Sequence, residues 1–224
     1  MGNWLYFIVI AAGTYCLFVT VMVVLSVRKM RHPQGLLEEV RDPERLDDPQ
    51  GITAWARAQG FELDSQFDFS GIIGAGDIKM AVEGWFLPSK KLFLMHYHVL
   101  DKFYYEFVTG LEGDYSLTSS KSVDSLNLPF PPKMFVQVFE DDSLDELLEK
   151  HEKTLAFFKE RFGVAPIVPT LPLQEMILHS IETQMAYVQS LPFWYLRGLW
   201  WHLIRRRQLR NKSVIEQIHR LDGE

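Results

Sequence analysis

The sequence predicts an α+β protein that is attached to a membrane at its N-terminus. Three observations indicate this class: an uncharged apolar run opens the chain, aromatic and β-branched runs fill its middle, and apolar residues at helical spacing dominate its last third. We therefore expect an N-terminal transmembrane helix, an antiparallel β-meander packed by a helix, and a C-terminal helical segment that contains an interfacial amphipathic helix.

Charge is divided unevenly along the 224 residues, which carry a net charge of −6. Residues 36–192 hold 26 acidic and 13 basic side chains, whereas residues 1–35 hold three basic and no acidic ones. Residues 193–224 hold seven basic and three acidic side chains. An acidic middle between two basic ends indicates that the ends meet an anionic surface. The single cysteine, Cys16, excludes an intramolecular disulfide and gives no support for an oxidising compartment.

The apolar run at residues 4–27 would measure about 36 Å as a helix, enough to cross a hydrocarbon layer of about 30 Å. Trp4 and Tyr6 stand at one end, where interfacial aromatic residues are found, and Arg28 and Lys29 follow the other end. A cleaved signal peptide needs a basic N-terminal region and a shorter apolar core, so we expect this helix to be retained. The positive-inside rule then predicts a single pass through the cell membrane, with the N-terminus outside and the soluble domain in the cytosol.

The rest of the chain divides into a linker, a soluble domain and a C-terminal helical region. The linker is polar, contains three prolines, and predicts a tether with about one helical turn. We assign residues 1–31 to the transmembrane anchor and its basic flank, 32–50 to the polar linker, 51–165 to the α+β domain, and 166–224 to the C-terminal helices.

The α+β domain opens with a predicted short helix at residues 51–63, which ends at Gly60. Aromatic and β-branched runs that follow predict strands, and the short junctions between neighbouring runs favour antiparallel pairing. The expected strands are residues 77–87, 91–100, 102–109, 115–120 and 133–139.

Residues 143–163 give the clearest helical pattern of the soluble part, because their apolar residues recur at three and four positions. Ser143 and Glu146 form the pattern of a capping box at its start, and Gly163 predicts its end. Such a helix laid on one face of an antiparallel sheet defines the α+β class. Residues 171–191 show the same periodicity and predict a second helix.

The middle of the chain also resembles a known group of proteins. The segments that carry the resemblance read "AWARAQGF", "FVTGLEGDYSLTSS", "LPFPP" and "LDELLEKHEKTL". Over roughly half of its length the chain resembles a group of uncharacterised bacterial single-pass membrane-anchored proteins. The resemblance implies a shared domain and brings no catalytic residues with it.

Three histidines are the candidates for chemistry: His96, His98 and His151. The first two are two residues apart in an expected strand, so they point to one face and could start a metal site that His151, Asp101 or Glu106 would complete. His151 lies on the apolar stripe of its helix, where an imidazole is either a general base or a core residue bonded to its neighbours. We favour a structural role for all three, and we expect no metal site and no cofactor.

Residues 193–210, "FWYLRGLWWHLIRRRQLR", join a short apolar helix face to a block of arginines. The apolar part is too short to span a bilayer, and this composition is typical of a helix that lies in a membrane interface. Packing on the domain or on a partner is the alternative, while nucleic acid is disfavoured because the adjoining domain is acidic. The expected apolar side consists of Phe193, Leu196, Trp200, Leu203 and Ile204. The expected membrane-binding residues are Trp194, Arg197, Trp200, Trp201, Arg205, Arg206, Arg207 and Arg210.

Three functions are compatible with these features. We favour a membrane-anchored, non-enzymatic interaction or scaffolding protein that exposes its acidic domain at the cytosolic membrane face and binds the lipid bilayer and a protein partner. The first alternative is a membrane-associated, hydrolase-like enzyme that uses His96, His98 or His151. The second alternative is a peripheral lipid-sensing module that uses the segment 193–210.

Overall fold

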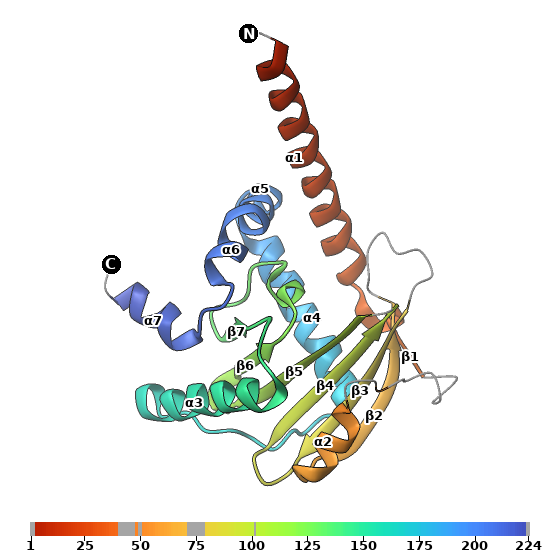
Figure 1. The fold of residues 1–224 in the computed structure, drawn as a ribbon, viewed down its shortest axis with the longest axis vertical. Helices are drawn as coiled ribbons and strands as arrows, with labels where there is room; N and C mark the ends of the chain where they lie inside the picture. The colour runs from red at the N-terminus through yellow and green to blue at the C-terminus, as the bar shows by residue number, and fades with distance from the viewer. Residues whose placement is uncertain (1–2, 40–47, 49–50, 71–78, 101, 223–224) are drawn as a thin grey trace.

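A seven-stranded sheet forms the centre of the fold, and a long N-terminal helix projects away from it (Figure 1). The computed structural model describes residues 3–39, 48, 51–70, 79–100 and 102–222. The fold is α+β, as the sequence predicts, with the apolar helix first and further helices on both faces of the sheet.

The strands follow one another through the sheet in chain order. All neighbours pair antiparallel except the last two, which pair parallel. The expected antiparallel meander is therefore confirmed up to the sixth strand and is wrong for the seventh. The strands are β1 (Leu37–Glu39), β2 (Glu62–Phe69), β3 (Met80–Leu87), β4 (Leu92–Val99), β5 (Lys102–Leu111), β6 (Tyr115–Ser120) and β7 (Met134–Val138), with the 3-10 turn η3 (Glu112–Asp114) between β5 and β6.

The parallel pairing of β7 has its cause in the connection that precedes it. Residues 121–133 contain the 3-10 helix η4 (Val123–Leu126) and three prolines. A connection of this length returns the chain to the start of β6, where Ser116 pairs with Met134, and both strands then run the same way. A two-residue hairpin would have forced an antiparallel neighbour.

Two strands, β1 and β2, are absent from the prediction. The first half of β2 is polar and exposed, so it lacks the aromatic and β-branched pattern of its neighbours. Strand β1 lies inside the expected linker, after the one-turn helix η1 (Pro33–Gly35), and its Leu37 pairs with Phe69. Parts of the expected linker and of the first expected strand lie outside the described residues: 40–47, 49–50 and 77–78.

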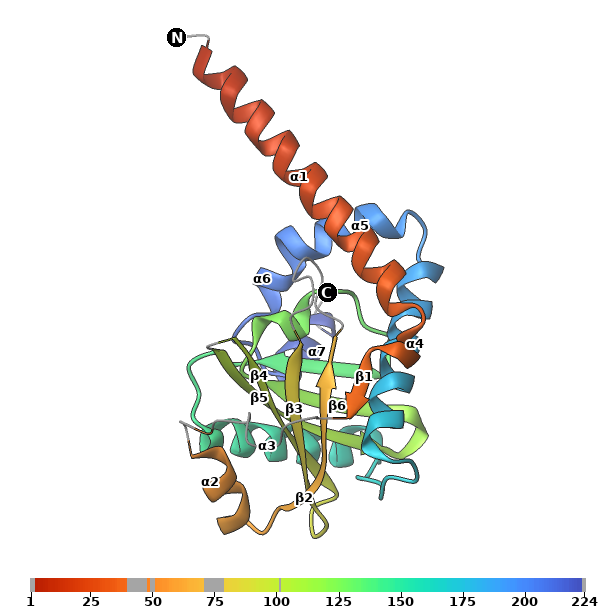
Figure 2. The same ribbon diagram turned by 90° about the vertical axis from the view of Figure 1, so that its right-hand side faces the viewer.

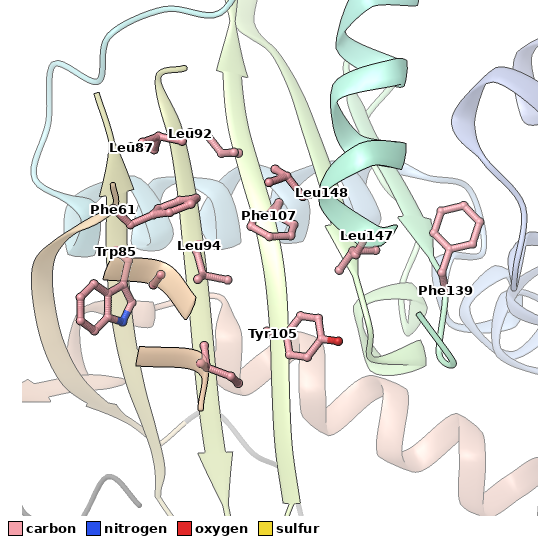
Figure 3. Packing of buried hydrophobic residues seen from close by; sticks show 12 residues of the cluster. Phe61, Trp85, Leu87, Leu92, Leu94, Tyr105, Phe107, Phe139, Leu147 and Leu148 are labelled. Atoms are coloured by element: carbon pink, nitrogen blue, oxygen red, sulfur yellow. The ribbon is translucent and has the colours of Figure 1, made fainter. Parts of the chain in front are cut away.

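One face of the sheet is covered by α2 (Ile52–Ala58) and α3 (Leu144–Phe162). An apolar core fills the space between them, and Figure 3 shows Trp85 and Phe107 of the strands together with Leu147 of α3 in this core. The capping box and the terminal glycine predicted for the long helix are both present in α3. This core anchors the helix on which the buried histidine lies.

The opposite face of the sheet is covered by α4 (Leu173–Ser190). Leu173 packs into a cluster with Phe67 and Phe93. It also lies over Gly84, where an added Cβ would collide with the leucine side chain. A glycine at this strand position therefore lets α4 approach the sheet closely.

The C-terminal region contributes four helical elements, which are α5 (Trp194–Trp200), η5 (Trp201–Arg205), α6 (Arg206–Leu209) and α7 (Val214–Asp222). The segment between α6 and α7 covers the outer edge of β7, because the backbone N–H of Asn211 donates to the carbonyl of Val138 at 2.9 Å. The amide of Gln217 donates to the carbonyl of Val136 at 3.2 Å. The edge strand is thus covered by the chain itself.

Candidate functional site

The helix α1 (Asn3–Met30) divides into a projecting first half and a packed second half (Figures 1 and 2). Val19, Val23 and Val27 repeat every four residues, so they share one side of the helix, and all three are buried in a cluster with Met185 of α4. Within the described part of the chain, α1 is the one helix long and apolar enough to cross a membrane. The exposed apolar residues of α1 that precede Val19 are Trp4, Tyr6, Phe7, Ile8, Val9, Ile10, Tyr15, Leu17 and Phe18.

The helix α5 crosses α1 at a glycine, and both views place it beside the second half of α1 (Figures 1 and 2). Gly198 is buried, and a Cβ built on it would lie 2.6 Å from Cγ1 of Val23, closer than real side chains approach. Trp194 and Leu199 pack into the same cluster as Val23. The contact fixes α5 along α1 at the level of Val23, a constraint that the sequence pattern alone does not contain.

An exposed apolar stripe runs along the outer side of α5. The elements α5, η5 and α6 follow without a break in helical backbone, and η5 is a π-helical turn within them. Phe193, Leu196, Trp200 and Ile204 are exposed by 70%, 52%, 48% and 45%, and we call these four residues the aromatic stripe. They are four of the five residues expected on the apolar side, and the fifth, Leu203, is half-buried.

The other two tryptophans of this segment turn toward the protein. Trp194 is half-buried in the cluster on α1. The indole N–H of Trp201 donates to the carbonyl of Leu126 at 2.8 Å, and its ring meets Phe130 edge-on with 5.4 Å between ring centroids. Intramolecular packing therefore accounts for Trp194 and Trp201, whereas Trp200 stays exposed.

The arginine block is divided in the same way. Arg206 forms an ion pair with Asp124 of η4, with 3.0 Å between Nη2 and Oδ1, and Arg210 forms one with Glu140. Both acidic partners belong to the α+β domain, so these two arginines attach the C-terminal helices to it. Arg207 is exposed between them.

A hollow of about 320 Å³ lies beside α6 and α7. Arg205 faces it, and its guanidinium also donates to Gln208 at 3.4 Å. Arg197 is exposed on the neighbouring α5. Arg197 and Arg205 thus lie on the same helical segment as the aromatic stripe. The residues lining the hollow are Arg205, Gln208, Leu209, Lys212, Glu216, Gln217 and Arg220.

The candidate base His151 is fully buried between the sheet and α3. Its Nε2 lies 2.9 Å from the hydroxyl of Thr109, and its Nδ1 lies 2.8 Å from the hydroxyl of Ser119. Burial lowers the pKa of His151 to about 3, so the ring is neutral near pH 7. Both ring nitrogens are satisfied inside the protein, and this supports the core role that we favour from the sequence.

Gln137 of β7 extends this buried network. Its amide donates to the hydroxyl of Ser119 at 2.7 Å, and its carbonyl oxygen accepts from Thr154 of α3 at 3.1 Å. The same oxygen accepts from the backbone N–H of Val214 at 3.0 Å, at the start of α7. One amide therefore joins the sheet, α3 and α7. The sequence analysis does not identify Gln137, although a glutamine at an inward position of an apolar strand is the available signal.

The candidates His96 and His98 lie on β4, where His96 is buried and His98 is half-exposed. His96 is buried, with its Nδ1 3.3 Å from Oε2 of Glu83 on the neighbouring strand. Burial raises the pKa of Glu83, but hydrogen bonds from His96 and Gln66 outweigh it and leave the pKa below its usual value. His98 stacks on Phe103 at 4.4 Å between centroids.

His151 lies far along the sheet from the other two histidines. His96 pairs with Tyr105 on β5, and the partner of His151, Thr109, lies four residues farther along the same strand, about 13 Å away. Among the described residues, which do not include Asp101, no group of three or more His, Cys, Asp or Glu side chains is placed to hold a metal ion. The structure therefore does not bring the three candidates together.

Glu106, a possible further ligand of the metal site considered from the sequence, is half-buried on the other side of the sheet. Glu106 accepts hydrogen bonds from the hydroxyls of Tyr97 and Ser125, the latter at 3.3 Å. Burial raises the pKa of Glu106 and outweighs these hydrogen bonds. Alternation along β5 is the signal for it, because a glutamate between Tyr105 and Phe107 must point away from the core that those two enter.

Comparison of the chain with models of protein families, with curated proteins and with solved structures finds no match.

Proposed function

We propose that the chain is a single-pass protein of the cell membrane, in which α1 spans the bilayer and the α+β domain acts at the cytosolic face as a non-enzymatic interaction or scaffolding module. The observation that carries the proposal is the division of α1 into an exposed apolar half and a half packed on the domain. Exposed apolar surface costs about 25 cal/mol per Å² in water, so hydrocarbon is the environment that fits this half.

The base of α1 supports the proposed orientation. Arg28 and Lys29 follow the apolar run directly, and clustered basic residues favour the cytosolic side of a membrane. The amine of Lys29 also donates to the carbonyl of Ser70 at the end of β2, at 2.6 Å. The basic flank is thereby tied to the sheet, which supports a position of the domain on the same side of the membrane as this flank.

The charge of the domain supports a role in binding. Residues 51–165 contain 18 acidic and 11 basic side chains, so a basic protein surface is the partner that charge complementarity favours. The hydrolase-like alternative would need an accessible histidine. His151 and His96 are both buried against partners of the same chain, which leaves only the half-exposed His98 among the three candidates. The lipid-sensing alternative is favoured by one observation, the exposed aromatic stripe, and it shares the anchor with the main proposal.

Membrane insertion and orientation are tested together on the full chain. We expect the protein to stay in the membrane pellet after alkaline carbonate washing. In a Cys16→Ala background, a cysteine at Asn3→Cys should react with an impermeant maleimide on intact cells, whereas one at Leu171→Cys should react only after lysis. Release by carbonate would overturn the anchor, and the reverse labelling pattern would overturn the orientation.

The interaction role is tested by chemical cross-linking in native membranes. A discrete adduct that high salt abolishes is expected, because an acidic surface attracts its partner through charge. The exposed Glu149 and Lys153 on α3 offer a matched pair of variants. Glu149→Lys should weaken the adduct more than Lys153→Glu does, while a chain that stays monomeric in all mild detergents, with no adduct, would contradict the proposal.

A further inference from the structure

The depth of α5 in the bilayer follows from the length of the apolar run. As a helix, residues 4–27 measure about 36 Å, whereas a hydrocarbon core of about 30 Å takes up about 20 residues. The span therefore begins between about residue 4 and about residue 8, and its inner end falls between about residue 23 and about residue 27. Tilt of the helix lengthens the span and moves this end toward the later residue.

In every such placement, Val23 lies at the inner boundary of the hydrocarbon or up to about 6 Å inside it. Gly198 of α5 packs directly on Val23, and Trp194 packs into the same cluster. A helix held against this part of α1 lies at the same depth. It cannot stand in the water above the membrane while the contact exists.

We propose that α5 lies in the cytosolic leaflet at the boundary of headgroups and acyl chains, with the aromatic stripe facing the acyl chains and the exposed arginines facing lipid phosphates. This inference rests on the proposed function, because it takes α1 to span the bilayer. It adds a second membrane-embedded element and names lipid as the occupant of an apolar face that the described part of the chain leaves uncovered. Amphipathic interfacial helices are buried to a similar depth, about 5–10 Å.

Lipid rather than a protein groove is the occupant that the surroundings favour. The aromatic stripe lies on the side of α5 that faces away from Gly198, and the neighbouring α1 also carries exposed apolar side chains. Arg197 and Arg207 are exposed on the same helical segment, where anionic headgroups of the cytosolic leaflet attract basic side chains. Trp200 lies among these residues, and tryptophan is enriched at this depth.

The crossing has the form of helix packing inside a membrane, where a small residue lets two backbones approach. Beyond it, the π-helical turn η5 leads to Arg206 and Arg210, whose ion pairs with Asp124 and Glu140 return the chain to the domain. The domain is thus held to the bilayer by two helices, which fixes its orientation relative to the membrane plane.

Spin labels on the full chain in vesicles of mixed phosphatidylcholine and phosphatidylglycerol test the depth. In a Cys16→Ala background, single nitroxides are placed through Leu196→Cys, Phe7→Cys and Leu171→Cys. Leu196 and Leu171 are both exposed leucines, at 52% and 46%, but Leu171 precedes α4 and lies at the end of that helix remote from α5. Oxygen concentrates in hydrocarbon and a nickel chelate stays in water, so the ratio of their collision rates reports depth.

We expect the ratio at position 196 to exceed that at position 171 several-fold and to approach the ratio at position 7. A ratio at 196 equal to that at 171 would overturn the inference and leave the anchor intact. Shielding of position 196 from both reagents would also overturn it, because a protein surface would then cover the stripe. An aqueous reading at position 7 would instead refute the transmembrane anchor itself.

A second variant keeps the test independent of the label. Gly198→Leu places a large side chain against Val23 and should lift α5 away from α1, so that the ratio at position 196 falls toward that at position 171 while position 7 is unchanged. An unchanged ratio of collision rates at position 196 in this variant would show that the contact with α1 does not set the depth of α5.

Discussion

Two regions of the molecule hold residues that are unusual for their surroundings. In the core, His151 and Gln137 are polar and fully buried, while on α1 and α5 residues such as Phe7 and Trp200 are apolar and exposed. The buried polar atoms of His151 and Gln137 all have partners within the chain. The exposed apolar side chains have no cover among the described residues.

This difference separates structure from function in the chain. Polar groups in a core cost little when each is bonded, and they then fix how the elements join. Apolar groups on a surface point to something outside the chain that covers them. His96 and His151 attract attention in the sequence, yet both are buried, and the exposed apolar surface is the one that points to a partner.

Gln137→Leu should give the largest loss of stability, because it removes the amide at the centre of the buried hydrogen-bond network. The hydroxyls of Ser119 and Thr154 and the backbone N–H of Val214 would each lose a partner in the core. We expect the free energy of unfolding to fall by about 3 kcal/mol, measured by urea denaturation in detergent micelles. The exposed Gln59→Leu is the matched control, with an expected change within about 0.5 kcal/mol. Equal effects of the two substitutions would show that the buried network contributes nothing.

How much of the fold can be predicted from the sequence depends on how far apart in the chain the interacting residues lie. The apolar run of α1 and the helix α3 are encoded locally, by composition, by spacing and by the capping box, so both follow from the sequence. The parallel strand β7 and the strand β1 depend on which distant segment each meets, and no local pattern specifies that.

The candidate site shows the same limit. Helical periodicity places Leu196 and Trp200 on one side of α5, which the structure shows as exposed, whereas Phe193 precedes the helix with a left-handed backbone. The inward turn of Trp201 depends on the carbonyl of Leu126, which lies 75 residues earlier in the chain. A residue-by-residue assignment of the tryptophans and arginines therefore needs the tertiary structure.

The second largest effect should be the loss of stability at low pH. It tests whether His151 stays unprotonated in the folded protein. Its pKa is about 3 in the folded protein and about 6.5 when unfolded, so below pH 6.5 the unfolded chain binds a proton that the folded one does not. Stability is then complete above pH 6.5 and falls as the pH drops. Between pH 6.5 and pH 5 the loss should be about 2 kcal/mol. Urea denaturation at several pH values measures this slope, and His151→Asn should flatten it. An equal slope in that variant would assign the pH dependence to other groups.

Gly198→Ala should have a smaller effect and tests the contact between α5 and α1. Alanine favours a helix over glycine by up to about 1 kcal/mol, so a neutral site would gain stability. The Cβ would instead lie 2.6 Å from Val23, and we expect a net loss of about 1 kcal/mol in thermal unfolding. Val23→Ala in the same chain should recover most of the loss, which a double-mutant cycle measures. Additive effects of the two substitutions would show that the helices do not touch at this point.

The smallest expected effects distinguish two neighbouring arginines, one paired with the domain and one exposed. Arg206 is paired with Asp124, which is largely exposed, so Arg206→Ala should cost less than about 1 kcal/mol of stability. Arg207 is exposed, so Arg207→Ala should leave stability in neutral detergent unchanged but reduce the rise in unfolding temperature on adding anionic lipid. Arg206→Ala should keep that rise, because its charge already faces the domain. If both variants lost the rise equally, the arginine block would act as one diffuse charge, and the division between domain-facing and lipid-facing arginines would not hold.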